Sequence, residues 1–167
     1  QMHQRLKQPN LANTLKTISR NGVKGFYEGE VATKIDTFMK ENGGLITKKD
    51  LKNYRPIWRE TLRGNFNEHE IVTMGPPSSG GVHIIQMLNI LENYDLIKMR
   101  HNSPTYTALL IESMKYAYAD RSKYLGDPEF FDVPVQSLIS KEYAQKISKK
   151  ITLNSITASE KILPGSE

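Results

Sequence analysis

Two adjacent serines in a loop of proline and glycine are the first residues of this chain that suggest chemistry. The run Pro76-Pro77-Ser78-Ser79-Gly80-Gly81 leads directly into an apolar segment with a helical period. Proline fixes the incoming backbone, glycine permits close approach and positive φ, and serine can cap the free N–H groups of a helix. Such a loop can receive a ligand, contact another segment of chain, or only begin its own helix.

Catalysis by either serine would need a general base held close to the hydroxyl group. The sequence offers only His83, a few residues further on. Helix capping is therefore the preferred interpretation for Ser78 and Ser79. A phosphate cradle is a second functional interpretation, but the run lacks the Gly-Lys-Ser/Thr ending with which a P-loop holds phosphates and magnesium.

The histidines show no spacing that is typical of metal ligands, and the chain contains no cysteine. We therefore expect neither a metal ion nor a cofactor. Surface or capping roles are expected for all four histidines, which are His3, His69, His83 and His101.

Charged and aromatic side chains gather in the segment from 116 to 127. Asp120 and Arg121, with Asp127 further on, could form a functional charge pair, but a structural ion pair or helix-end bond is favoured. The helical spacing of the tyrosines indicates packing, with their hydroxyl groups bonded at the edge of the core. These tyrosines are Tyr116, Tyr118 and Tyr124. Trp58, the single tryptophan, is predicted to anchor the core beside the strands.

Composition predicts one soluble globular domain, because 167 residues with 38% hydrophobic and 25% charged side chains suffice for a single core. The formal charge of +5 comes from basic residues that alternate with acids, and the densest clusters are pairs such as Lys48-Lys49. A solvated basic surface is favoured over a nucleic-acid site. No apolar run approaches the ~18 residues of a membrane span, and the first residues lack the apolar core of a signal peptide.

Periodicity predicts a mainly helical α+β chain with one small pair of antiparallel strands. The strands are expected at 61–67 and 70–74. The expected helices are 11–21, 31–41, a short turn after Thr47, 80–93, 104–125, and 135–151 with a break near Ser140. In the helix over 104–125, one stripe is predicted to consist of Leu110, Met114, Ala117 and Arg121. The end of the chain, 152–167, is rich in polar residues and is expected to be extended or disordered.

Several blocks of residues in a fixed order resemble the γ-glutamyltranspeptidase family. The blocks are Phe26-Tyr27-Glu28-Gly29, Gly43-Gly44-Leu45-Ile46-Thr47, Tyr54-Arg55-Pro56, the loop 76–81 with His83-Ile84, Lys115-Tyr116-Ala117-Tyr118-Ala119-Asp120-Arg121, and Tyr124-Leu125-Gly126-Asp127-Pro128. The resemblance covers about residues 11 to 150. Such a series of blocks is far more specific than one short motif.

The resemblance implies an N-terminal-nucleophile (Ntn) hydrolase with an αββα sandwich, made as a precursor that cuts itself into two subunits. In this family the new N-terminal threonine of the small subunit is the nucleophile, and glutathione is the usual donor. This chain is similar to the C-terminal part of the large subunit. It contains no Thr-Thr pair, so no catalytic or substrate-binding residue is assigned to it. The loop 76–81 is expected to be a structural wall near the site of the whole enzyme.

The expected organisation is an extension over 1–10, a single domain over 11–151, and a flexible tail over 152–167 close to the cleavage point. The expected partner is the small subunit of the same precursor, with a γ-glutamyl compound such as glutathione as substrate of the complete enzyme. The isolated chain is expected to be inactive and to self-associate through apolar surface. The family suggests a periplasmic or secreted parent protein. The alternatives are a helical interaction or basic nucleic-acid-binding module and an independently active serine hydrolase.

Overall fold

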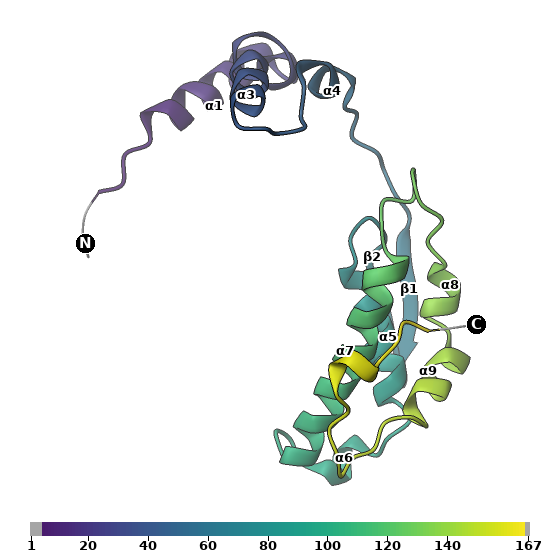
Figure 1. Ribbon diagram of the computed structural model, residues 1–167. Helices are drawn as coiled ribbons and strands as arrows, with labels where there is room; N and C mark the ends of the chain where they lie inside the picture. The colour runs from purple at the N-terminus through teal and green to yellow at the C-terminus, as the bar shows by residue number, and fades with distance from the viewer. Residues whose placement is uncertain (1–4, 166–167) are drawn as a thin grey trace. The chain divides into compact units, whose positions relative to one another are not determined.

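The computed structural model describes residues 5–165, which form two compact units that divide after Trp58 (Figure 1). The first unit is helical, and the second contains the strand pair with the remaining helices. The observed fold class is therefore α+β and mainly helical, as periodicity predicts. The single domain expected over 11–151 stays a prediction, and each unit is described by itself below.

Four helices make up the first unit, and they are α1 (Pro9–Asn21), α2 (Lys24–Tyr27), α3 (Gly29–Glu41) and α4 (Lys48–Asn53). Gly22 ends α1 with a φ of 58°, and its N–H donates to the Ile18 carbonyl. The short α2 was not expected, because four residues carry no readable apolar period. Leu11 and Leu15 of α1 and Phe38 of α3 are each at least half exposed, so the apolar faces of these helices are only partly covered within the unit.

The helix α4 lies where the sequence predicts a short turn after Thr47, and it begins with a capping box. The Thr47 side chain accepts a hydrogen bond from the Asp50 N–H, and the Asp50 carboxylate accepts one from the Thr47 N–H at 2.8 Å. The start of α4 is also tied to α3, because the Lys48 N–H donates to Asp36 Oδ1 at 3.0 Å. These bonds satisfy N–H groups that a helix cannot pair internally.

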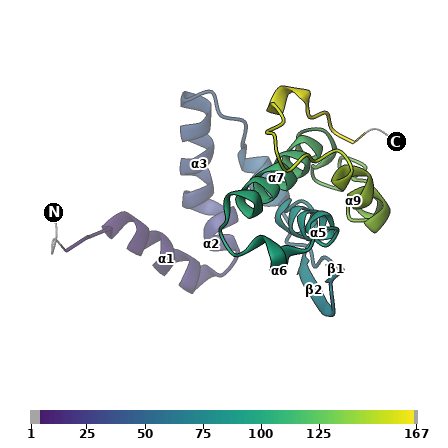
Figure 2. The same cartoon turned by 90° about the horizontal axis from the view of Figure 1, so that it is seen from below.

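The second unit is built around an antiparallel hairpin of β1 (Thr61–Phe66) and β2 (His69–Met74), in a register that pairs Thr61 with Met74 and Phe66 with His69. Helix α5 (Gly80–Leu91) packs on this hairpin (Figure 2). The approach is close at Gly64, where an added Cβ would lie 2.7 Å from Ile85 Cγ2. The end of β2 at Met74 and the start of α5 at Gly80 confirm the predicted boundaries.

The other face of α5 contacts α7 (Pro104–Tyr124) and α9 (Lys141–Ser148). Shorter elements connect them, namely α6 (Leu96–Met99), α8 (Val135–Leu138) and the 3₁₀ turn η1 (Ser159–Lys161). Ser103 and Ser140 cap α7 and α9, so the predicted proline start and the predicted break near Ser140 are both confirmed. The apolar core between the three helices consists of Ile90, Leu91, Leu109, Ala144, Ile147 and Ile151.

The buried face of α7 is not the stripe seen in the sequence, and the prediction for Trp58 is wrong. The buried residues of α7 are Leu109, Glu112, Ser113, Ala117 and Asp120, whereas Met114 and Arg121 of the predicted stripe are exposed. Apolar periodicity does not identify this face, because it carries the carboxylates of Glu112 and Asp120, which accept hydrogen bonds from other elements. Trp58 is fully exposed and anchors no core. It precedes β1 in a segment without regular structure.

The described part of the last segment, 152–165, contains a turn over 153–155 and η1, and the flexible tail expected over 152–167 stays a prediction. The segment packs against α7 within the second unit and is drawn in yellow in Figure 1. Ile162 is only 8% exposed, and the backbone of Gly165 is hydrogen-bonded to α7. Polar composition gave no sign of these contacts.

Candidate functional site

The loop between β2 and α5 brings the start of the helix into close contact with the end of the strand. An alanine Cβ at Gly81 would lie 2.8 Å from Thr73 Cγ2 and 3.0 Å from the carbonyl carbon of Met74, and closer still to the Met74 oxygen. Neither Gly80 nor Gly81 has a positive φ, and the Pro76–Pro77 peptide is cis. The predicted close backbone approach is thus confirmed at Gly81, whereas the loop glycines do not serve a left-handed turn.

The two serines of this loop differ from the prediction that both are caps. Ser79 occupies the N-cap position with helical angles (φ −77°, ψ −19°), and its side chain makes no capping bond. Its hydroxyl oxygen instead accepts a hydrogen bond from Arg121 Nε at 3.2 Å. Ser78 Oγ accepts from the Gly80 N–H at a long 3.4 Å. Capping is wrong for Ser79, because a capping side chain requires an extended backbone at that position.

His83 is buried, in contrast to the predicted surface or capping role. It is 6% exposed on α5, and its ring centroid lies 5.2 Å from that of Tyr118 on α7. Burial lowers the pKa of His83, and the nearby Arg121 charge lowers it further, while Asp120 opposes the shift. The His83 N–H donates to the Ser79 carbonyl oxygen at 3.1 Å as part of the helix, but within residues 5–165 no hydrogen bond joins the His83 ring to the hydroxyl group of Ser78 or Ser79. Neither serine therefore has His83 as a positioned base.

The other histidines and tyrosines fall into different environments. His69 and His101 are exposed as expected, and His3 lies outside the described residues. Tyr116 packs against the apolar core, and Tyr118 is 55% exposed. Among residues 5–165 no three acidic or histidine side chains are grouped in a way that could hold a metal ion.

Asp120 lies at the centre of a buried polar cluster in the second unit. It is 2% exposed and accepts hydrogen bonds from Gln86 Nε2 at 2.5 Å, the Tyr143 hydroxyl at 2.8 Å and the Gly165 N–H at 2.6 Å. Burial and the bond to Asp120 raise the pKa of Tyr143 far above its ordinary range, so its hydroxyl stays a donor. The cluster joins α5, α7, α9 and the last segment.

Within residues 5–165, Asp120 and Arg121 form no ion pair with each other. Consecutive residues of a helix point in different directions, so one side chain faces the core and the other faces the loop at Ser79. Asp127 pairs with Arg59 at 3.3 Å, which ties the start of the second unit to the end of α7. These charges are therefore structural, as the preferred interpretation has it.

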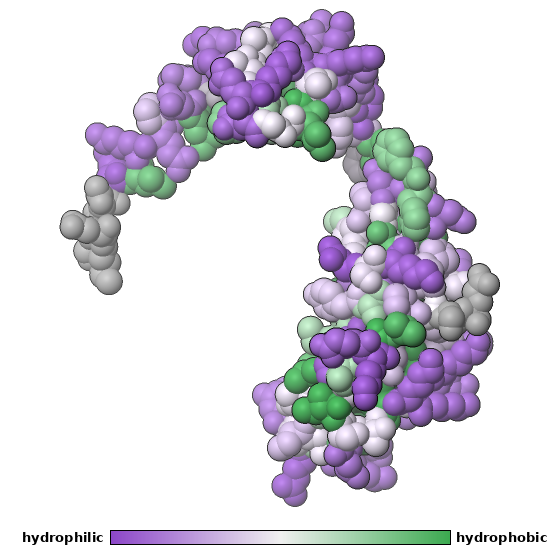
Figure 3. All heavy atoms as spheres, in the orientation of Figure 1, coloured by the Kyte–Doolittle hydropathy of each residue, from purple (hydrophilic) through white to green (hydrophobic). Residues whose placement is uncertain are grey.

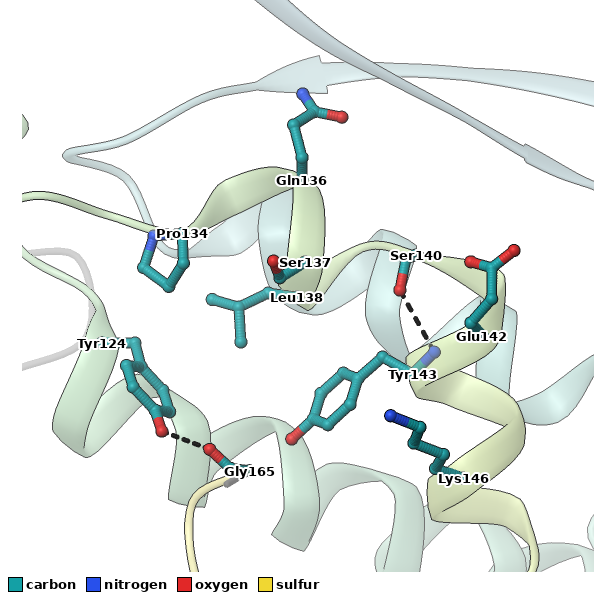
Figure 4. A pocket seen from close by; sticks show the side chains of 10 residues that line it. All are labelled: Tyr124, Pro134, Gln136, Ser137, Leu138, Ser140, Glu142, Tyr143, Lys146 and Gly165. Atoms are coloured by element: carbon teal, nitrogen blue, oxygen red, sulfur yellow. Dashed lines mark hydrogen bonds between the residues drawn. The ribbon is translucent and has the colours of Figure 1, made fainter. Parts of the chain in front are cut away.

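A cavity of about 510 Å³ opens beside the Asp120 cluster, between the end of α7 and the helices α8 and α9. Its walls include Tyr124, Leu138, Tyr143, Lys146 and Gly165 (Figure 4). Ser140 also lines it, and its hydroxyl oxygen accepts from the Tyr143 N–H. Sequence reasoning missed this cavity, because its residues come from separate segments and share no motif.

Comparison with known proteins identifies the family. The family model described as gamma-glutamyltranspeptidase matches residues 1–166. The chain is 47% identical over 160 residues to the glutathione hydrolase proenzyme of Escherichia coli (strain K12), which covers 96% of this chain and 28% of the relative. It is 41% identical over 162 residues to the glutathione hydrolase proenzyme of Pseudomonas sp. (strain A14), again over 28% of that protein. The chain thus spans little more than a quarter of these relatives.

Solved structures show the same relationship. The γ-glutamyltranspeptidase of Helicobacter pylori superposes with a TM-score of 0.85 at 47% identity, over 95% of this chain and 45% of the other. A cephalosporin acylase from Bacillus halodurans superposes with a TM-score of 0.74 at 32% identity, over 84% of this chain and 26% of the other. The strand pair and helices described above are thus a part of an Ntn-hydrolase fold. From the match over nearly its whole length, we conclude that the chain belongs to the γ-glutamyltranspeptidase family.

Proposed function

We propose that the whole protein transfers or hydrolyses γ-glutamyl groups of glutathione-like substrates, and that this chain forms the C-terminal part of its large subunit. The observation that carries the proposal is the superposition on the H. pylori γ-glutamyltranspeptidase over 95% of the chain. The names of the Escherichia coli and Pseudomonas relatives, glutathione hydrolase proenzymes, support the same activity and a precursor.

The reaction needs a nucleophile that this chain does not supply. No Thr-Thr pair occurs in the 167 residues, and the hydroxyl oxygen of Ser79 is bonded to Arg121 rather than to a base. We infer that the nucleophile is the N-terminal threonine of a small subunit, whose own amine acts as the base. The chain alone is then inactive. The loop 76–81 would act as a rigid wall near the site, because Gly81 fixes it against the end of β2.

The proposed partner is the small subunit of the same precursor. Apolar side chains reach the surface of each unit (Figure 3). Side chains that are at least two-thirds exposed include Leu45, Met74, Ile97, Phe130, Ile156 and Leu163. Burial of such apolar surface against a partner is favourable, so the isolated chain is also expected to self-associate. No helix over 5–165 is long and apolar enough to cross a membrane. We propose a periplasmic or secreted location for the parent protein.

The test compares the complete precursor with this chain, using γ-glutamyl-p-nitroanilide as substrate. The precursor should cut itself into two subunits and release p-nitroaniline, whereas the chain alone should release none. A precursor that stays uncut and inactive would contradict the proposal. Turnover by the chain alone that disappears in Ser78→Ala or Ser79→Ala would instead support the serine hydrolase alternative.

A second candidate is an acylase activity on other amide substrates. The chain is 45% identical over 142 residues to the acylase ACY 1 proenzyme of Pseudomonas sp. (strain V22), and the Bacillus acylase shares the fold. The same precursor assayed with a γ-glutamyl anilide and with an acylated cephalosporin would separate the two, through the ratio of kcat/KM values. The basic-module alternative predicts DNA or RNA affinity that falls steeply with salt, and we expect no such binding.

A further inference from the structure

Two buried carboxylates on α7 hold the last described segment of the chain. Glu112 and Asp120 are each 2% exposed and lie about two helical turns apart on the same face. Each accepts a hydrogen bond from a backbone N–H of the segment, from Thr157 and Gly165 respectively. The segment is therefore bonded to α7 at two points along its length.

The first point surrounds Gly165. Its N–H donates to Asp120 Oδ1 at 2.6 Å, and its carbonyl oxygen accepts from the Tyr124 hydroxyl. An added Cβ would lie 2.5 Å from Tyr143 Cζ and closer still to the Tyr143 hydroxyl. Figure 4 shows the two tyrosine rings directed toward Gly165 from α7 and α9. The backbone of residue 165 is thus bonded on both sides, and on its third side the Tyr143 ring, held by its bond to Asp120, occupies the space that a side chain would need.

The second point surrounds Thr157. Lys115 Nζ donates to the Thr157 carbonyl oxygen at 2.8 Å and to Glu112 Oε1 at 2.7 Å, while the Thr157 N–H donates to the same carboxylate at 3.3 Å. Burial raises the pKa of Glu112, but hydrogen bonds from Lys115 and Thr157 outweigh it, so the pKa lies below its ordinary value. The carboxylate is therefore charged when it holds the segment.

Between the two points the segment contributes little apolar contact. Ile162 is 8% exposed, whereas Ile156 and Leu163 are 79% and 76% exposed. The segment is thus recognised through its backbone, through one apolar side chain and through the absence of a side chain at Gly165. Recognition of this kind is how proteins bind extended peptides.

We propose that Glu112, Lys115, Asp120, Tyr124 and Tyr143 form a peptide-binding site that requires glycine at one position, with residues 157–165 of this chain as its occupant. The segment is a ligand held in cis rather than part of the core. This inference concerns the chain itself and does not depend on the proposed enzymatic activity.

The first experiment measures amide hydrogen exchange over 157–165 in the full chain. Gly165→Ala should release the segment and speed exchange at these amides by at least about tenfold, because the added methyl group collides with Tyr143. Leu163→Ala, which trims an exposed side chain of the same segment, is the matched control and should leave exchange unchanged. Equal protection in Gly165→Ala and the unaltered chain would overturn the proposal.

A compensating change tests the contact directly. Leucine at position 143 lacks the ring atoms that an alanine at 165 would meet, so the double variant Gly165→Ala/Tyr143→Leu should exchange no faster than Tyr143→Leu alone. Additive effects of the two changes would overturn the assignment of Tyr143 as the wall of the glycine position.

A peptide added in trans gives a measurement that does not rely on the tethered segment. A fluorescent peptide of residues 155–165 should bind the Gly165→Ala chain, whose own segment is released. Its binding to the unaltered chain should be at least about tenfold weaker, because the site is filled by effective concentration. A peptide with alanine in place of its glycine should also bind at least about tenfold more weakly. Equal binding of the two peptides, or no binding to the Gly165→Ala chain, would overturn the proposal.

Discussion

The contact of Gly81 with the end of β2 can be tested by a pair of adjacent substitutions. Gly81→Ala places a methyl group 2.8 Å from Thr73 Cγ2 and 3.0 Å from the Met74 carbonyl carbon. The nearest neighbour is the backbone carbonyl oxygen of Met74 in β2, which cannot rotate away as a side chain can. Gly80→Ala places its methyl group 3.6 Å from Ser78 Oγ, an ordinary contact. The two variants therefore add the same atoms to the same helix but differ in what those atoms meet.

The expected changes have opposite signs. Overpacking a close contact costs about 1–3 kcal/mol, and the upper half of that range applies because backbone must move. Alanine is a better helix former than glycine by up to about 1 kcal/mol, a gain that both variants share. The free energy of unfolding should thus fall by about 1–2 kcal/mol in Gly81→Ala. It should stay equal or rise by up to about 1 kcal/mol in Gly80→Ala.

Urea unfolding followed by far-ultraviolet circular dichroism measures both changes. The two variants should differ by about 1–3 kcal/mol, so with a slope of about 2 kcal/mol per molar urea the midpoint of Gly81→Ala should lie about 0.5–1.5 M below that of Gly80→Ala. Two variants with equal midpoints would refute the close approach of α5 to β2. An unchanged slope would show that the comparison concerns stability and not the compactness of the unfolded chain.

Three further changes test other parts of the structure. Thr47→Ala removes the capping box of α4 and should lower the free energy of unfolding of the first unit by about 1 kcal/mol. Thermal unfolding measures this change, and an unchanged free energy would show that the cap does not stabilise the helix. Glu112 has a pKa below its ordinary 4.5, so its stabilising contribution is present above that pH and is lost as pH falls through the lowered value. The unfolding free energy should therefore decline in acid, and Glu112→Gln should flatten the decline. Trp58→Ala should change stability by less than about 0.5 kcal/mol, because the side chain is fully exposed.

Features fixed by local chemistry could be predicted from the sequence. The helical turn after Thr47, the helix start at Pro104 and the break near Ser140 depend on neighbouring residues alone, and all three occur in the structure. The hairpin and the start of α5 follow from proline, which cannot donate within a strand ladder, and from the turn-forming residues between the strands. These signals act over three or four residues, so no knowledge of tertiary contacts is needed to see them.

Features fixed by distant partners could not be predicted. Aspartate is usually exposed at the surface. The burial of Asp120 is explained only by its hydrogen bonds to Gln86, Tyr143 and Gly165. Helix α7 illustrates the consequence, since its buried face carries Glu112 and Asp120 and therefore shows no apolar period. The cap expected at Ser79 is absent for a similar reason, because the Ser79 hydroxyl oxygen accepts its hydrogen bond from Arg121 on another helix.

The buried polar residues of α5 connect the packing of the helices to the position that binds Gly165. Gln86 and Asn89 lie three residues apart on one face, and their amide groups donate to Asp120 on α7 and to the Ile139 carbonyl before α9. An apolar interface of isoleucine and leucine tolerates small shifts between helices, whereas a buried hydrogen bond is costly to break. These two amides therefore set the position of α5 against α7 and α9. Gln86 Nε2 donates to Asp120 Oδ2, so Asp120 Oδ1 stays directed at the Gly165 N–H. The core of the unit thereby orients the carboxylate that binds the segment 157–165.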